Sequence, residues 1–265
     1  MISPTSTGAE AAGTGNTAPE TLDGWFALHD LRSFDRAAWS ALTPAARKST
    51  LAEAVEVLSI FERVDDAPAG RSVSFSIIGH KADLLLFHLR PEVGQLHALE
   101  RAFNDTALAR FTTRPYSYLS VIEISRHGAP EGAAENIESS PYVQARLYPE
   151  IPSYSNFVCF YPMSKKREGD DNWYSLDSGE RSDLMRAHGR TGRKYAGRVS
   201  QIVTGSMGLD DWEWGVTLFS NDPLEFKKLI YEMRFDEVSA RFAEFGPFYV
   251  GERLFPENLG RCLGE

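Results

Sequence analysis

The 265-residue sequence lacks several features that would assign it to a familiar class of proteins. No apolar run approaches the roughly 20 residues that a membrane-spanning helix needs, so we expect no membrane contact. Residues 1–20 are rich in Ala, Gly, Thr and Ser and contain neither the basic nor the apolar region of a signal peptide, which predicts a disordered tail. The two cysteines, Cys159 and Cys262, lie far apart and favour a reduced, cytoplasmic protein over a disulfide framework.

Basic residues are also in the minority, and the net charge is −9. Such a balance argues against general nucleic-acid binding, which needs a broad basic surface. It leaves room for an anionic small molecule held by a few local Arg and Lys side chains. The sequence has no P-loop, no dinucleotide fingerprint and no Cys-x-x-Cys-His haem attachment motif, so any tetrapyrrole would be bound without covalent links.

A six-element order occurs twice along the chain. Alternating and helical patterns predict strand, helix, strand, strand, helix, strand for residues 22–31, 43–61, 72–78, 82–89, 92–103 and 116–124. The same order follows at 156–163, 180–188, 199–204, 213–220, 224–233 and 248–251. We therefore predict an α+β fold in which two ferredoxin-like β-α-β-β-α-β halves form a dimeric α+β barrel within one subunit.

These patterns divide the chain into five segments. We expect a tail at 1–20, an N-terminal ferredoxin-like half at 21–126, a connection at 127–153, a C-terminal half at 154–253 and a C-terminal tail at 254–265. Aromatic residues gather in the C-terminal half, which also contains a single histidine, and we place the function there.

The strand that begins at Asn156 carries the most unusual pattern. Alternation puts Cys159, Tyr161, Met163 and Lys165 on one side, so that a phenol, a thioether and an ammonium group stand in a row. Taken singly, Tyr161 fits core packing and Lys165 fits a surface position. A pocket for an aromatic anion explains the row as a whole.

His188 precedes Gly189 at what the pattern predicts to be a helix C-terminus. A histidine there often interacts with the helix dipole, and the functional alternative is an axial ligand to a haem-type iron. Zinc is disfavoured because no second ligand stands at convincing spacing from His188. Gln201 lies on a mainly apolar strand, where its amide bonds either a loop or a ligand but cannot serve as an acid–base catalyst.

A basic run surrounds the helix that carries His188, and a solvated face is its simplest explanation. In an acidic protein this run is also the obvious local site for carboxylates. Arg234 could reach an anion, and Ser239 could donate a hydroxyl hydrogen bond.

Several stretches resemble the coproheme decarboxylases, the chlorite-dismutase-like haem-synthesis enzymes of Gram-positive bacteria. The resemblance covers most of residues 22–251 and is carried by long, specific motifs. They are Tyr161-Pro162-Met163-Ser164-Lys165-Lys166-Arg167, Asn172-Trp173-Tyr174, Leu184-Met185-x-x-His188-Gly189, Thr204-Gly205-Ser206, the run from Gly208 to Gly215 and the run from Tyr231 to Arg241.

The resemblance implies a concrete activity. Iron coproporphyrin III (coproheme) is both substrate and redox centre; hydrogen peroxide oxidatively decarboxylates two of its propionates to vinyl groups, and haem b is the product. His188 matches the axial iron ligand, Tyr161 the tyrosine that becomes a radical, and Lys165 a lysine near the second reactive propionate. The remaining matched porphyrin contacts are Arg146, Pro162, Met163, Ser164, Gln201, Arg234 and Ser239.

Gln201 matches the distal glutamine that stands where true chlorite dismutases have an arginine, which argues against chlorite breakdown. The resemblance also implies a homopentamer and a transient contact with the coproporphyrin ferrochelatase. Two alternatives stay open: a non-catalytic haem-binding carrier or sensor, and a chlorite-degrading haem enzyme.

Overall fold

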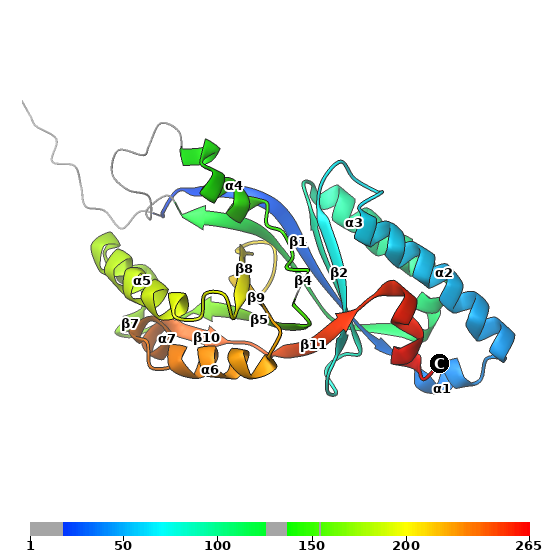
Figure 1. The fold of residues 1–265 in the computed structure, drawn as a ribbon. Helices are drawn as coiled ribbons and strands as arrows, with labels where there is room; N and C mark the ends of the chain where they lie inside the picture. Colours follow the sequence, from blue (N-terminus) through cyan, green and yellow to red (C-terminus); the bar gives the residue numbers. More distant parts are fainter. Residues whose placement is uncertain (1–17, 126–136, 154) are drawn as a thin grey trace, which may run out of the picture.

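The first half of the chain forms a strand–helix–strand–strand–helix–strand unit. A computed structural model describes residues 18–125, 137–153 and 155–265, and its course is drawn in Figure 1. The elements of the first unit are β1 (Thr21–Phe34), α1 (Arg36–Ser40), α2 (Pro44–Arg63), β2 (Arg71–Ile77), β3 (Leu84–Arg90), α3 (Val93–Asn104), the 3-10 turn η1 (Leu108–Phe111) and β4 (Thr112–Ser125).

The second half repeats this order with additions. A turn η3 (Ile137–Ser139) and helix α4 (Pro141–Leu147) precede it, and the C-terminal turn η5 (Pro256–Leu263) follows it. Its elements are β5 (Phe157–Lys165), the hairpin β6 (Arg167–Glu168) and β7 (Asp171–Asn172), η4 (Trp173–Ser175), α5 (Ser178–Arg193), β8 (Ser200–Gly205), β9 (Trp214–Ser220), α6 (Pro223–Met233), α7 (Glu237–Phe242), β10 (Ala243–Phe245) and β11 (Tyr249–Leu254).

The strands close into a barrel. Their order is β10-β5-β11-β2-β3-β1-β4-β8-β9, and β9 also pairs with β5. Within each unit the fourth, first, third and second strands are neighbours in that order, which is the ferredoxin-like arrangement, so the predicted α+β fold is confirmed. The two units join where β11 pairs with β2 and where β4 pairs with β8. Because both ends of each sheet are paired, neither unit leaves a long exposed edge there.

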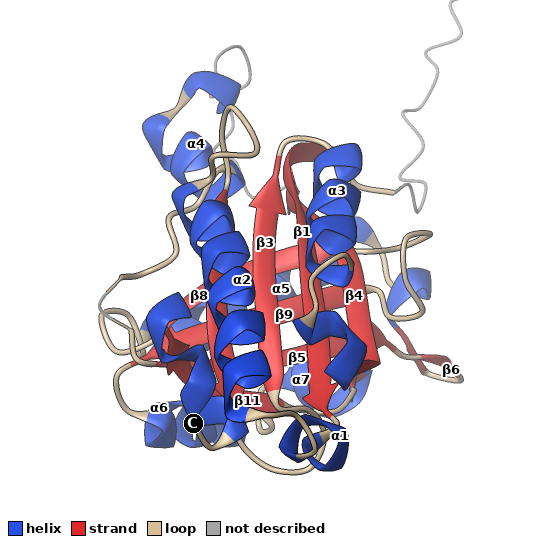
Figure 2. Ribbon diagram, turned by 90° about the vertical axis from the view of Figure 1, so that its right-hand side faces the viewer, coloured by secondary structure: helices blue, strands red, loops and turns tan. Residues whose placement is uncertain are grey.

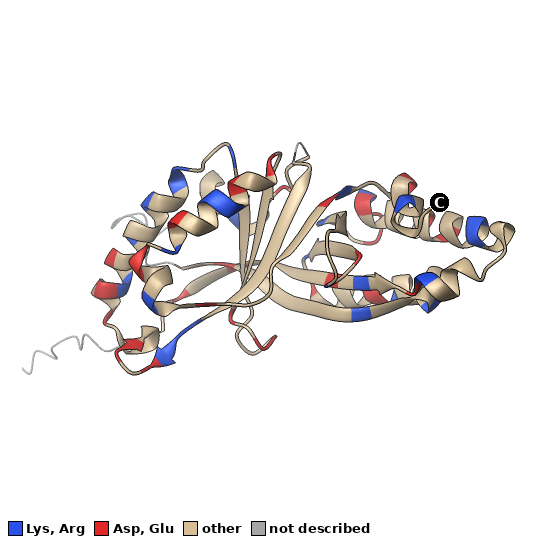
Figure 3. Cartoon of the chain, turned by 90° about the horizontal axis from the view of Figure 1, so that it is seen from below, with Lys and Arg blue, Asp and Glu red and all other residues tan. Residues whose placement is uncertain are grey.

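Alternation divides the side chains between the inside and the outside of the barrel. Val158 and Phe160 of β5 join the barrel core with Ile202, Phe219 and Tyr118. The outside of the N-terminal half packs against α2 and α3, which cover it as Figure 2 shows. Charged residues lie mainly on the helices and at the strand ends, while the strands in the middle of the barrel carry few (Figure 3).

Three segments differ from a simple strand–helix repeat. The tail prediction falls largely on residues 1–17, which lie outside the described residues. Helix α4 begins at Ser140-Pro141 inside the expected connection, and it buries Val143 and Leu147 against Leu22. Residues 256–263, where we expected a tail, pack Leu259 and Leu263 into the cluster under α2. Among the described residues, no helix is both long and apolar enough to cross a membrane.

Two histidines are buried in the N-terminal half. His29 lies inside the barrel, its ring stacked between Phe87 and Phe160 at centroid distances of 4.4 and 3.9 Å. His88 lies on the opposite face, with its Nδ1 atom 2.8 Å from the Ser72 hydroxyl. Burial lowers the pKa of each histidine from 6.5 to about 3, because the charged imidazolium is disfavoured away from water.

These histidines should make the protein sensitive to mild acid. The unfolded chain takes up protons below pH 6.5 while the folded chain does not, so stability is complete above that pH and falls as the pH is lowered towards 3. We expect each histidine to lower the free energy of unfolding by up to about 1.4 kcal/mol per pH unit in this window. Urea unfolding at pH 7, 6 and 5 measures this effect. The free energy of unfolding should change less with pH in His29→Gln than in wild type. His97 is exposed, so His97→Gln should keep the pH dependence of the wild-type free energy of unfolding. The same pH dependence in all three proteins would refute the low pKa of the buried histidine.

Candidate functional site

Strands β5, β9 and β8 share one outward-facing surface, which we call the C-terminal face. In the register of the sheet, Tyr161 pairs with Val216, and Val216 pairs with Val203. Two strand spacings of about 4.8 Å therefore separate Val203 from Tyr161 on the same face. Gln201 stands two residues along from Val203, and both side chains are exposed.

Tyr161 is the aromatic centre of this face. Its ring stacks on Phe248 at a centroid distance of 4.6 Å and lies 5.8 Å from the Phe245 ring. Burial raises the pKa of the phenol, the neighbouring Cys159 raises it further, and Arg234 opposes them. The phenol therefore keeps its proton at neutral pH.

Lys165 ends the same row and is buried. Its ammonium nitrogen lies 4.4 Å from the centre of the Trp173 ring. Burial lowers the pKa of Lys165 to about 8, while the carboxylates of Asp236 and Glu213 oppose that shift. The backbone N–H of Lys165 donates to Glu213 Oε2 over 2.7 Å, which fixes this end of β5.

His188 is held by a carboxylate. Its Nδ1 atom lies 2.9 Å from Oδ1 of Asp236, and Asp236 also accepts from the Val238 N–H as the N-cap of α7. With the proton on Nδ1, Nε2 carries the lone pair that a metal ion would take. Asp236 was not singled out from the sequence, because a partner 48 residues away leaves no local pattern.

The predicted helix end at His188 is wrong. Helix α5 continues to Arg193, and Gly189 and Gly192 lie within it. A capping box at Asp177 and Glu180 stabilises its start, and two basic residues occupy its last turn. His188 therefore lies before the last turn of the helix. Interaction with the helix dipole, which acts at the last turn, does not account for its position.

Helix α5 buries no side chain completely, although it is sixteen residues long. By contrast, α2 buries four of its side chains against the N-terminal half. Met185 on α5 is 45% exposed, and Val203 on β8 is 39% exposed. Helix α5 instead contacts α6 and α7. A helix placed in this way leaves apolar surface that a ligand can cover.

The remaining predicted contacts lie in different places. The guanidinium of Arg234 stands 3.8 Å from the centre of the Phe245 ring, and Ser239 is buried on α7. Alternation turns the side chains of Pro162 and Ser164 to the other side of β5, where the Ser164 hydroxyl accepts from the Glu213 N–H. Arg146 lies on α4, which packs against β1 and β4.

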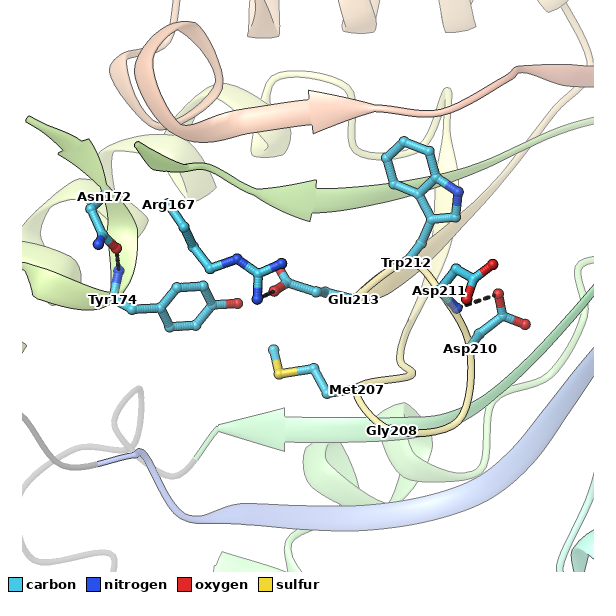
Figure 4. Close-up of a pocket in the computed structure, with 9 residues that line it drawn as sticks. All are labelled: Arg167, Asn172, Tyr174, Met207, Gly208, Asp210, Asp211, Trp212 and Glu213. Carbon is cyan, nitrogen blue, oxygen red and sulfur yellow. Dashed lines mark hydrogen bonds and ion pairs between the residues drawn. The ribbon is translucent and has the colours of Figure 1, made fainter. Parts of the chain in front are cut away.

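A cavity of about 420 Å³ lies beyond the end of β5. Figure 4 shows Arg167 and Tyr174 on one side, Trp212, Asp211 and Asp210 on the other, and Glu213 and Met207 between them. The buried Glu213 carboxylate, which lies 3.4 Å from Arg167, therefore connects this cavity to Lys165. The acidic character of the loop before β9 did not single out Glu213 in the sequence.

The chain resembles a family of known fold over most of its length. The chlorite dismutase family model matches residues 38–254. A structure described as a novel heme-binding protein from Thermus thermophilus is 47% identical, with a TM-score of 0.86 over 94% of this chain and 98% of that one.

More distant structures share the fold. A mutant chlorite dismutase from Candidatus Nitrospira defluvii is 20% identical, with a TM-score of 0.73 over 91% of this chain and 97% of that chain. The chlorite dismutase of that organism in complex with imidazole is 21% identical, with a TM-score of 0.70 over 91% and 96% of the two chains. The family model and the barrel agree, and the chain belongs to the chlorite dismutase family.

Proposed function

We propose that this protein uses hydrogen peroxide to decarboxylate two propionates of iron coproporphyrin III to vinyl groups, giving haem b. The observation that carries the proposal is the pairing of a carboxylate-bound histidine with a row of phenol, thioether and ammonium groups. His188 leaves Nε2 for iron, and Tyr161 and Lys165 stand on one face of β5. The similar heme-binding protein from Thermus thermophilus supports a tetrapyrrole ligand.

The cations of the site suit a substrate with several carboxylates. Burial makes the Lys165 ammonium costly even though the Asp236 and Glu213 carboxylates partly offset that cost, and the lowered pKa reflects what remains. A propionate beside it would supply the missing charge-assisted hydrogen bond. Arg234 provides a second cation near the Tyr161 ring stack, and Ser239 a hydroxyl donor.

The protein's own groups divide the work. Asp236 fixes the His188 ring, and with the proton held on Nδ1 the Nε2 atom would be free to bind the iron. When bound, the iron porphyrin together with peroxide supplies the oxidising power. Tyr161 would give its electron to the peroxide-oxidised substrate and its proton to the peroxide-derived oxygen, and the resulting radical would regain a hydrogen atom from the propionate arm. Its raised pKa keeps the phenol protonated at neutral pH, so the hydrogen is present when the reaction begins.

Gln201 favours this reaction over chlorite breakdown. The amide is exposed on the C-terminal face, where the resemblance aligns it with the arginine of chlorite dismutases. An amide offers a hydrogen bond but no positive charge to an anionic oxidant. We therefore expect almost no dioxygen from chlorite.

The proposal extends to the protein's surroundings. We propose a homopentamer in the cytoplasm, where thiols such as the two free, buried cysteines stay reduced. A transient contact with the coproporphyrin ferrochelatase would deliver the substrate.

Replacing Tyr161 by Phe should separate binding from catalysis. The ring and its stacking on Phe248 are kept, so iron coproporphyrin III should still bind. Without the phenolic hydrogen, vinyl formation should fall by at least about 100-fold, or about 2.7 kcal/mol of activation free energy. Mass spectrometry of the porphyrin after peroxide addition measures the loss of two carbon dioxide molecules. His188→Ala is the companion variant, and its porphyrin spectrum should change.

Two results would contradict this proposal. If wild type binds iron coproporphyrin III and peroxide releases no carbon dioxide, the protein is a carrier or sensor. If Tyr161→Phe forms haem b at the wild-type rate, the radical does not reside on Tyr161.

Replacing Lys165 by Met should stabilise the ligand-free protein while weakening the site. The folded pKa of about 8 lies below the unfolded value of 10.5, so stability rises with pH between these values and the penalty is complete below pH 8. We expect Lys165→Met to gain up to about 3 kcal/mol at pH 7 and to lose this pH dependence. Binding of iron coproporphyrin III should weaken by roughly 10- to 100-fold as a charge-assisted hydrogen bond is lost.

Denaturant unfolding and absorption titrations measure the two effects. Lys166→Met, one residue away on the other face of the chain, is the matched control and should change stability by less than about 0.5 kcal/mol. If Lys165→Met is less stable than wild type and binds iron coproporphyrin III normally, Lys165 does not belong to the site.

A further inference from the structure

The sheet is irregular beside the middle of β5. Strand β10 stops pairing with β5 at Phe245, which lies opposite Met163. Strand β11 resumes the pairing at Tyr249, which lies opposite Phe160. Two residues of β5 therefore face three residues of the intervening chain, 246–248. One extra residue on one of two paired strands is a β-bulge, and bulges often re-aim a side chain beside a functional site.

Pro162 explains why the bulge forms at this place. Its carbonyl accepts from the Gly246 N–H over 2.9 Å, so this edge of Pro162 faces the bulge. In an antiparallel strand the N–H and C=O groups of a residue point to the same side, and proline has no N–H to give there. Gly246 allows the close approach, because a Cβ atom at this position would lie 2.7 Å from the Cγ atom of Pro162. The sequence itself therefore favours an interrupted ladder here.

The bulge brings two phenylalanine rings onto Tyr161. Phe245 and Phe248 are three residues apart, and in a regular strand they would face opposite sides. With the extra residue, both contact the Tyr161 ring, at centroid distances of 5.8 and 4.6 Å, and their own centroids lie 6.3 Å apart. The Phe248 ring is the nearer one and is stacked on Tyr161 with an interplanar angle of 30°.

Ring contacts, and no hydrogen bond, hold the Tyr161 phenol. Tyr161 is buried, and within the described part of the chain its hydroxyl makes no hydrogen bond. The first side-chain torsion of a tyrosine sets where the hydroxyl oxygen lies, and the second, which has only broad minima, turns the ring plane. The Phe248 ring against the face of Tyr161 restricts both torsions. The direction in which the phenol presents its hydrogen therefore depends on Phe248.

Lys81 anchors Phe248 from the N-terminal half. It lies in the turn between β2 and β3, which reaches the bulge because β2 pairs with β11. Its Nζ atom donates to the Phe248 carbonyl over 2.7 Å and lies 5.7 Å from the centre of the Tyr249 ring. The Ile78 N–H donates to the Val250 carbonyl over 2.8 Å and fixes the same turn to β11. The bulge is thus held by β5 on one side and by this turn on the other.

Resting on the proposed function, we propose that Phe248 is a positioning residue for the decarboxylation and that Lys81 holds it in place. The stacked ring directs the Tyr161 phenol towards the bound substrate, so that the radical formed there meets the propionate arm. No bond forms or breaks at Phe248 or Lys81. The N-terminal half, which carries none of the predicted porphyrin contacts, thereby contributes to the site through a single hydrogen bond.

Phe248→Leu tests the stack, because it keeps an apolar side chain on the bulge but offers no flat ring. With saturating iron coproporphyrin III and hydrogen peroxide, vinyl formation should fall by about 10- to 100-fold, since a misplacement of about 1 Å can cost that much. The KM for the porphyrin should stay within about threefold of wild type, because the binding contacts are kept. Phe255→Leu, at an exposed phenylalanine beyond β11, is the control and should match wild type.

Lys81→Met tests the anchor at an exposed position, so the fold should survive the change. Losing the hydrogen bond to the Phe248 carbonyl should slow vinyl formation by about three- to tenfold at an unchanged KM. Lys81→Arg keeps a donor and should restore most of the rate. Lys48→Met removes the same charge from an exposed position on α2 and should match wild type.

A third measurement observes the Tyr161 ring in the ligand-free protein. In protein labelled with 3-fluorotyrosine, the fluorine resonance that disappears in Tyr161→Phe belongs to Tyr161. This resonance should shift in Phe248→Leu and in Lys81→Met, and it should stay in place in Lys81→Arg and Lys48→Met. A general loss of stability would not move this one resonance selectively.

The outcomes separate the two proposals. If wild type forms no haem b, the proposed function fails. If wild type is active and Phe248→Leu keeps its rate, the function stands and the positioning role is overturned. A KM that rises as much as the rate falls would also overturn it, because Phe248 would then serve binding. An unmoved Tyr161 resonance in Lys81→Met, or Lys81→Arg as slow as Lys81→Met, would overturn the role of Lys81.

Discussion

The pairing of β9 with both β5 and β8 is the constraint on which the candidate site depends. This central strand closes the barrel, and its register decides which side chains share the C-terminal face. If the register shifted by one residue along β9, Tyr161 and Gln201 would no longer lie on the same face, because neighbouring residues of a strand face opposite sides. The barrel core enforces the register, since Phe160 and Phe219 must point inward together.

The site is built from groups that weaken the ligand-free fold. Lys165 is buried as a cation, and α5 leaves apolar surface uncovered. Each is unfavourable in an empty protein and favourable beside a large, flat, multiply charged ligand. Such concentrations of unfavourable groups are typical of sites kept for function.

Local patterns predicted the architecture and the shared face of several side chains on β5. Strand alternation placed Tyr161, Met163 and Lys165 on one face, and the repeated order of elements predicted two ferredoxin-like units. The predictions were less accurate where glycine or distant partners decide the outcome. Gly189 suggested a helix end, although the capping box and the basic last turn carry α5 past His188 to Arg193.

The contacts that no pattern revealed join residues far apart in the chain. Asp236 meets His188 across 48 residues, and Trp214 meets Glu123 across 91. Neither pair falls within the short window in which periodicity or capping signals can be recognised, so only the folded chain brings the partners together.

The two halves share one topology but differ in what covers them. Against the outside of the N-terminal half, α2, α3 and η5 pack a continuous apolar cluster that includes Leu86, Leu99 and Leu259. The equivalent place on the other half lies under α5, which buries no side chain. The two halves therefore share a backbone arrangement but not the ability to bind a ligand. We expect each chain to bind one flat ligand, on the C-terminal half. The N-terminal half, which its helices cover, would act as a rigid support.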